Sequence, residues 1–207
     1  MKIIDISWPI SGDMTQYKDR QLVFVGQTHF IKHDGVSMSS ILVSSHTGTH
    51  IDAPSHFLQE GKPLSQVPLE THIGKALVID CTGVPVITKE VLSRHTIPEG
   101  IILLCKTDNS KKKVTDRYDP QFVAISECAA RYLIERKIKA VGLDYPGLER
   151  GNKDHVVHAL LLGNEIGIIE GLRLEKVEPK EYFFCCLPIA LQNTDGAPAR
   201  AVLIEER

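Results

Sequence analysis

One segment of eleven residues, His46–His56, holds most of the side chains that could do chemistry in this 207-residue chain. It reads His-Thr-Gly-Thr-His-Ile-Asp-Ala-Pro-Ser-His and contains three of the nine histidines together with Asp52. Neutral imidazole and carboxylate are common ligands of catalytic divalent metals. Three histidines and an aspartate this close together therefore predict a metal site that activates water.

The backbone of this segment must fold back on itself if its side chains are to share a metal. In a straight strand, His46 and His50 would lie roughly 13 Å apart, whereas two ligands of one ion must each lie about 2 Å from it. A helix would bring these two histidines together but would turn the other two candidates away. We therefore expect a strand over residues 39–45 that runs into a folded loop, with Gly48 permitting the turn and Pro54 stiffening the exit.

A second group of acidic and histidine residues, at His155, His158, Glu165 and Glu170, could complete such a site. Two ions would need ligands from more than one loop. His155 and His158 taken alone are typical of a helix face. Glu170 is the stronger candidate, because it follows an apolar strand-like run and a carboxylate at a buried strand end needs a partner.

The elements that must position these residues can be read from hydrophobic runs and capping residues. Strands are predicted at 3–6, 22–25, 39–45, 76–80, 101–105, 140–144, 166–169, 182–187 and 201–204. The run 101–105 is apolar throughout and the run 76–80 is apolar up to Asp80, as expected of strands covered on both faces. Short helices are predicted after Thr88, Ser126 and Asp154, each a plausible N-cap, with the last helix ended by Gly163. Strands that alternate with helices predict one α/β domain over residues 1–207.

Composition bounds the remaining possibilities. The content of hydrophobic residues (43%) and charged residues (24%) is ordinary for a globular protein, and a net charge of −2 gives no attraction to nucleic acid or to anionic membranes. No apolar stretch approaches transmembrane length, and no secretory segment is recognisable. Five cysteines without zinc-ligand spacing predict a reduced, cytoplasmic protein.

Other enzyme classes lack their signatures in this chain. There is no Gly-x-Ser-x-Gly elbow, no Gly-x-Gly-x-x-Gly and no phosphate-loop motif. The zincin pattern is also missing, because Thr47 stands where that pattern has its glutamate. Metal-assisted hydrolysis remains, against the alternative of a metal-binding protein without catalysis. A structural zinc needs only four ligands from compact motifs, and this chain offers at least five candidates.

The chain resembles the metal-dependent hydrolases of the cyclase superfamily, which include the bacterial kynurenine formamidases. Four stretches spread along the chain carry the resemblance: Asp5–Ser7, His46–Phe57, His158–Leu172 and Asp195–Val202. The second stretch matches the family signature at every characteristic position. The resemblance implies an α/β fold with a mixed, partly barrel-like β-sheet flanked by helices, and a homo-oligomer, either a dimer or a tetramer.

The resemblance also implies roles for individual residues. The implied metal ligands are His46, His50, Asp52, His158 and Glu170. Asp52 would bridge two ions, and His56 would be the acid/base group near the reacting carbonyl. Zinc is the implied metal, at two ions per chain, and manganese occurs in relatives.

The resemblance points to a small-molecule amide as substrate. Hydrolysis of an aryl formamide of the N-formylkynurenine type, a reaction of tryptophan catabolism, is the primary expectation. Residues 14–19 lack the Trp-Pro-Gly of the kynurenine formamidases, which keeps open a cyclic amide such as isatin. Trp8 and Tyr17 could line an aromatic pocket, although structural packing is at least as plausible for Trp8. Glu149 and Arg150 are most simply a surface ion pair.

Overall fold

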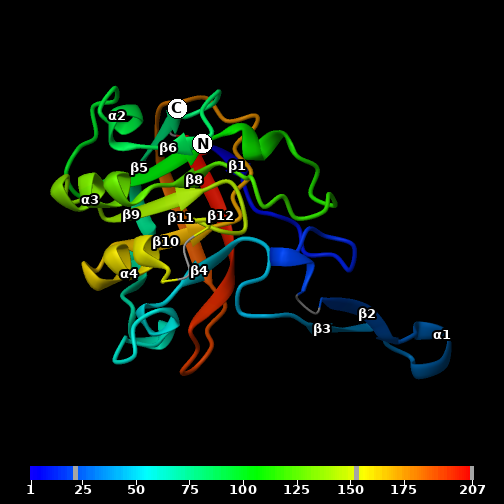
Figure 1. Cartoon of the computed structure of the whole chain (residues 1–207). Coiled ribbons are helices and arrows are strands. Elements are labelled where there is room, and N and C mark those ends of the chain that lie inside the picture. The colour runs from blue at the N-terminus through cyan, green and yellow to red at the C-terminus, as the bar shows by residue number, and fades with distance from the viewer. Residues whose placement is uncertain (21–22, 152–153, 206–207) are drawn as a thin grey trace.

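The computed structural model describes residues 1–20, 23–151 and 154–205. Its central feature is a mixed β-sheet that closes on itself (Figure 1). In order around the sheet, the seven strands are β12 (Gly196–Glu205), β11 (Glu181–Pro188), β5 (Ile73–Asp80), β7 (Ile102–Lys106), β9 (Ala140–Leu143), β10 (Gly167–Glu170) and β4 (His50–Asp52). β4 pairs again with β12, and β1 (Lys2–Asp5) pairs with the far half of β12. The predicted single α/β domain with a barrel-like mixed sheet is confirmed.

The parallel part of the sheet carries the helices. β5, β7, β9 and β10 are parallel neighbours, whereas the other pairings are antiparallel. The helices α2 (Lys89–Leu92), α3 (Glu127–Glu135) and α4 (Val156–Gly163) lie between these strands in sequence. They gather on the outer side of the parallel strands, where α3 contacts α2 and α4, and α4 contacts β10 (Figure 1).

Alternating side chains of the parallel strands build two apolar cores. In β7, Ile102 and Leu104 belong to the cluster inside the closed sheet. Leu103 and Cys105 belong to the cluster between the sheet and the helices. Because successive side chains of a strand point to opposite faces, a strand covered on both faces must be apolar throughout. This explains why the run 101–105, predicted as a buried strand, contains only apolar residues.

Two of the three predicted helix caps are confirmed. The hydroxyl of Thr88 accepts the Val91 N–H, and that of Ser126 accepts the Ala129 N–H. The prediction at Asp154 is wrong, because α4 has His155 at its N-cap position, with a left-handed φ of 47°, and it includes Gly163.

The expected strand over residues 39–45 is wrong in its extent. β3 (Met38–Leu42) ends earlier, and the cluster segment itself contains a strand, β4, where a loop was expected. The predicted strand 22–25 corresponds to β2 (Phe24–His29), and Leu22 lies outside the described residues. Each of the other predicted strands coincides with an observed one to within a few residues.

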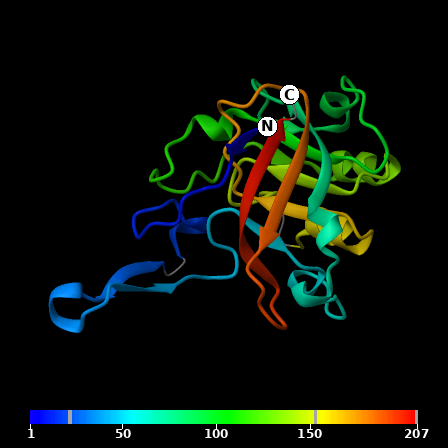
Figure 2. The ribbon, with the colours of Figure 1, turned by 180° about the vertical axis from the view of Figure 1, so that it is seen from behind.

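β2 and β3 form an arm that projects from the body, with α1 (Ile31–Asp34) at its tip (Figures 1 and 2). A second small pair, β6 (Val86–Ile87) with β8 (Ala124–Ile125), is parallel. Single turns of 3₁₀ helix occur at Tyr17–Asp19, Pro54–His56, Leu64–Gln66, Leu69–His72 and Asp108–Lys111. Among the described residues, every helix is too short or too polar to cross a membrane.

One histidine of the body is buried without a partner. His72 ends the turn that leads into β5, is 2% exposed, and its Nε2 atom has no hydrogen bond. Burial, with a contribution from the positive charge of Lys139, lowers the pKa of His72 from 6.5 to about 4. The folded state therefore requires this ring to be neutral.

We expect His72 to weaken the fold in acid. Its pKa is lower in the folded chain than in the unfolded one, so its contribution is complete above pH 6.5 and is lost as the pH falls from 6.5 toward about 4. The full loss corresponds to on the order of 3 kcal/mol. The free energy of unfolding, measured with urea at about pH 7.5 and about pH 4.5, should fall less between these pH values for His72→Leu than for the wild type. In the control His95→Leu, the free energy of unfolding should fall as much as in the wild type. Equal decreases in all three proteins would contradict the role of His72 in acid sensitivity.

Candidate metal centre

The pairing register of two strands builds the core of the site. β4 and β10 are antiparallel, with His50 opposite Glu170 and Asp52 opposite Ile168. Ile51 and Ile169 belong to the core inside the closed sheet. Since side chains alternate along a strand, His50, Asp52 and Glu170 point to the opposite face, which α4 covers.

His158 of α4 completes a compact buried group on that face. The His158 Nε2 atom lies 3.1 Å from Glu170 Oε1 and 3.8 Å from Asp52 Oδ2. The His50 Nε2 atom lies 3.3 Å from Glu170 Oε2 and 3.5 Å from Asp52 Oδ1. All four side chains belong to residues that are at most 5% exposed. Each histidine therefore presents one ring nitrogen to the same two carboxylates.

The far nitrogen of His50 is held by the folded backbone that precedes β4. The Gly48 carbonyl oxygen lies 2.9 Å from His50 Nδ1 and accepts the Nδ1–H, which leaves Nε2 directed at the cluster. Gly48 has a φ of +64°, which favours glycine, as the sequence predicted for the turn. The Thr49 hydroxyl fixes this turn, since it donates to the Gly171 carbonyl and accepts the Trp8 N–H.

The far nitrogen of His158 is held by a residue whose role sequence reasoning missed. Glu149 Oε1 lies 2.5 Å from His158 Nδ1. The same carboxylate accepts the backbone N–H groups of Val157 and His158 in the first turn of α4. Glu149 therefore caps the helix and orients the His158 ring, a common arrangement behind metal-binding histidines.

The predicted surface ion pair between Glu149 and Arg150 is wrong. Glu149 is buried and bonded to His158, whereas Arg150 donates to the Pro85 carbonyl oxygen at 3.0 Å. Two neighbouring opposite charges in the sequence do not indicate that one of the two side chains is buried. Only the packing of α4 against the sheet reveals which of the two faces inward.

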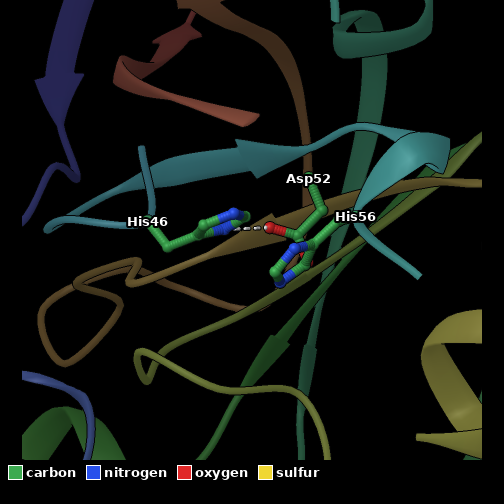
Figure 3. Close-up of side chains that lie close together, drawn as sticks. All are labelled: His46, Asp52 and His56. Carbon is green, nitrogen blue, oxygen red and sulfur yellow. Dashed lines mark hydrogen bonds and ion pairs between the residues drawn. The ribbon is translucent and has the colours of Figure 1, made fainter. Parts of the chain in front are cut away.

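His46 and His56 form the outer part of the site. Figure 3 shows both rings beside Asp52, and His46 Nδ1 lies 2.9 Å from Asp52 Oδ1. The two rings stack with their centroids 3.8 Å apart. The Asp195 Oδ2 atom lies 3.1 Å from His46 Nε2 and 3.4 Å from His56 Nδ1. Asp195 was seen in the sequence only as part of a family motif, and the structure places it as the partner of both rings.

Asp195 reaches His46 because the sheet closes at this point. The start of β12 pairs with β4, so that Gly196 lies opposite Asp52. A Cβ atom on Gly196 would lie 2.6 Å from the Ile51 carbonyl oxygen and 2.9 Å from the His46 ring. Glycine is therefore required here by the close approach of β4 and the His46 ring.

The electrostatic field of the cluster favours positive charge. Burial opposes the charged forms of His158 and His46, but hydrogen bonds and charge from neighbouring carboxylates raise the pKa of His158 to about 10 and that of His46 to about 9. Burial also opposes the charge of Glu170, yet hydrogen bonds with His158 and His50 hold its pKa well below the usual value. Among the described residues, the ion-pair partners of the cluster's carboxylates are all histidines, which suits the group to a cation.

The donor atoms gather in groups that could hold metal ions. Ligand atoms of His46, Asp52 and His56 lie within 4.8 Å of one another, and those of Asp52, His158 and Glu170 do so as well. Asp52 belongs to both groups, as a carboxylate shared by two ions would. Nitrogen and carboxylate oxygen donors are those that zinc and manganese accept.

The structure brings together every residue predicted for the site and separates one candidate from it. The residues that converge are His46, His50, Asp52, His56, His158 and Glu170. His56 lies as close to Asp52 as a ligand would, so its position is compatible with binding as well as with proton transfer. His155 lies beside Glu149 at the edge of the cluster. Glu165 does not join it and pairs with Lys62 at the surface.

The cluster forms the floor of a cavity of about 260 Å³. Tyr17, Phe57, Pro146 and Gly147 contribute to its walls, and Lys18 and His155 also line it. The predicted aromatic lining is thus found for Tyr17 but not for Trp8. Trp8 is buried in the core between sheet and helices, with the Arg173 guanidinium 4.7 Å from the centre of its ring.

Comparison with known proteins gives consistent similarities. Residues 4–150 match the Cyclase family. Kynurenine formamidase of Bacillus thuringiensis (strain Al Hakam) is 30% identical over 203 residues, which are 97% of this chain and 96% of that protein. A solved structure described as a potential metal-dependent hydrolase with cyclase activity is 36% identical, with a TM-score of 0.89 over 100% of this chain and 98% of that one. Isatin hydrolase A from Labrenzia aggregata, solved with benzyl benzoate, is 25% identical, with a TM-score of 0.84 over 98% and 93%.

Removing the carboxylate that orients His158 should weaken metal binding. Glu149→Gln keeps the shape of the side chain but loses the charge that fixes the ring, and we expect the affinity for zinc to fall about 10- to 100-fold. Titration against a chelator of known affinity measures the change. Glu165→Gln, at an exposed glutamate, is the matched control and should bind zinc like the wild type. Wild-type affinity in Glu149→Gln would refute the role of Glu149.

Proposed function

Because this chain belongs to the Cyclase family, we propose that it hydrolyses the amide bond of an aryl formamide with the help of divalent metal. The observation that carries the proposal is the buried histidine and carboxylate cluster at the floor of a cavity with aromatic walls. Its relatives make the chain a cyclase-family hydrolase of the arylformamidase-like type, acting on a non-peptide amide. The metal requirement and the identity of the amide are our inferences from the site.

Five residues would hold the metal: His46, His50, Asp52, His158 and Glu170. We infer two zinc ions per chain that share Asp52, with manganese as the alternative for the same donors. When bound, such ions lower the pKa of a coordinated water to about 7 and polarise a carbonyl oxygen. Gly48 and Glu149 orient the rings of His50 and His158, so that the donor nitrogens are in place before the metal arrives.

His56 is the residue best placed to move a proton. Its ring lines the cavity, stacks on His46, and has Nδ1 3.4 Å from Asp195 Oδ2. Burial lowers the pKa of His56 below its ordinary value, so the ring is mostly neutral near pH 7 and can accept a proton from water. The same ring can return that proton to the amine nitrogen as the carbon–nitrogen bond breaks. Asp195 fixes the ring orientation that both transfers need.

The cavity walls favour an aromatic amide. Tyr17 and Phe57 line a space of about 260 Å³, which suits one aromatic ring with a small substituent. The centroid of the Phe57 ring lies 4.1 Å from that of the His56 ring and 4.3 Å from that of the His158 ring. An aryl group held there would have its amide directed at the cluster.

A cyclic amide such as isatin is the second candidate. It is supported by the likeness to isatin hydrolase A, and ring opening breaks the same kind of carbon–nitrogen bond. A metal-binding protein without catalysis is the less favoured reading, because the cluster opens into a cavity, whereas structural zinc sites are closed.

The decisive experiment is an assay of N-formylkynurenine and isatin after metal reconstitution, with elemental analysis of the same sample. We expect deformylation that a chelator abolishes and zinc restores, with about two metal ions per chain. Opening of isatin without deformylation would move the assignment to cyclic amides. Bound metal without turnover of either compound would favour the non-catalytic reading, and a metal-free, inactive protein would overturn the proposal.

We further propose a cytoplasmic enzyme whose partner is a small-molecule amide and which binds neither nucleic acid nor membrane. The five cysteines are free, as in a reducing compartment. The net charge of −2 supplies no basic attraction to polyanions.

We also propose a homo-oligomer, a dimer or a tetramer, in which the arm packs on a second copy of the chain. β3 is exposed along its whole length and β2 along most of it, and a two-stranded ribbon alone is marginally stable. Its exposed apolar side chains are Phe24, Val25, Phe30, Ile31, Val36, Met38, Ile41 and Leu42. Exposed apolar side chains in this number on one small ribbon favour a partner that covers them.

Charge placed on the arm should therefore dissociate the oligomer. Ile41, which is 66% exposed, is the target, and we expect Ile41→Asp to shift the protein toward the monomer in analytical ultracentrifugation. Ile3→Asp, at an isoleucine of similar exposure (58%) on β1, is the control and should leave the assembly intact. A wild-type monomer, or an unchanged oligomer in Ile41→Asp, would contradict the role of the arm.

A further inference from the structure

Lys18 occupies an unusual position at the mouth of the cavity. It lies in the 3₁₀ turn Tyr17–Asp19 and lines both the cavity above the cluster and the hollow outside it. Its φ of 54° and that of Asp19, 52°, are both left-handed. Two consecutive residues other than glycine rarely adopt this conformation, and such strain is typical of segments that clamp a ligand.

Several contacts hold this strained turn in place. The Asp19 Oδ1 atom accepts the Tyr118 N–H at 3.0 Å, and the Tyr17 and Tyr118 rings meet edge to face at 5.1 Å. On its other side, the Tyr17 ring packs so closely on Gly147 that a Cβ atom there would lie 3.3 Å from Tyr17 Cε2. The turn is therefore a fixed part of the cavity wall, and the Lys18 backbone is fixed with it.

The Lys18 ammonium group is available to a ligand. Its Nζ lies 4.9 Å from the centre of the Tyr17 ring, and within the described residues no carboxylate forms an ion pair with it. The nearby acids are already engaged, Asp19 with Tyr118 and Glu149 with His158. Lys18 thus places a positive charge over an aromatic wall of the cavity whose floor is the histidine and carboxylate cluster, beside the neighbouring hollow that it also lines.

We propose that Lys18 binds a carboxylate on the end of the aryl substrate that points out of the cavity. The inference rests on the proposed aryl formamide hydrolysis and narrows it to anionic aryl formamides. With the amide at the cluster and the ring against Tyr17, a substituent on the far side of the ring reaches the mouth, where Lys18 stands. A carboxylate there gains a charge-assisted hydrogen bond, whereas a neutral group of the same shape does not.

Two isosteric substrates test this directly: 4-formamidobenzoate, which is an anion, and 4-formamidobenzamide, which is neutral. In the metal-loaded enzyme, we expect Lys18→Met to lower kcat/KM for the anion by about fivefold, mainly through KM, and to leave the neutral compound unchanged. Lys18→Arg should retain most of the preference, and Lys18→Glu should lower kcat/KM for the anion further. Lys176→Met, at an exposed lysine outside the cavity lining, is the matched control and should behave as the wild type.

Equal losses on both substrates would show a structural role for Lys18 and would overturn the inference, as would no loss on either. If the wild type hydrolyses neither compound, the proposed formamide activity fails instead. In that case calorimetric binding of 4-aminobenzoate and 4-aminobenzamide tests Lys18 separately. Preferential binding of the anion that disappears in Lys18→Met would support its role, and equal binding of both compounds would refute it.

Discussion

The burial of two carboxylates on one face of a strand pair is the constraint on which the rest of this structure depends. Asp52 and Glu170 are 3% and 5% exposed, and the register between β4 and β10 forces both onto the face beneath α4. A buried carboxylate without a partner costs several kcal/mol or more. His50 and His158 are those partners. The Gly48 carbonyl oxygen holds the His50 ring, and the Glu149 carboxylate holds the His158 ring. The closed sheet therefore brings together the side chains of the proposed metal site and fixes their orientation.

Much of the site follows from local sequence, and the remainder depends on contacts between distant segments. The spacing of His50 and Asp52 and the helix–strand unit from His158 to Glu170 are short-range features, so both could be recognised in the sequence. His158 was identified as a ligand only through the family resemblance. The roles of Glu149 and Asp195 could not, since one depends on how α4 packs and the other on β12 closing against β4.

The fold shows the same division between local and distant information. Apolar runs located the buried strands, because a strand covered on both faces leaves a clear pattern. The end of the predicted strand 39–45 was misplaced, because Val43 continues the apolar run of Ile41 and Leu42 although β3 ends at Leu42. The N-cap predicted at Asp154 was also wrong, because backbone N–H groups in the first turn of α4 donate to the Glu149 carboxylate rather than to a residue next to the helix.

The zinc content of the wild type and of Asp52→Asn, after loading and removal of unbound metal, tests the central claim most directly. Asp52 is common to two groups of donors, one with His46 and His56 and one with His158 and Glu170, so the account predicts about two zinc ions per wild-type chain and the loss of at least one in the variant. The amide keeps the shape of the side chain, and circular dichroism would verify that the variant is folded. Equal zinc content in the two proteins, or none in either, would contradict the account.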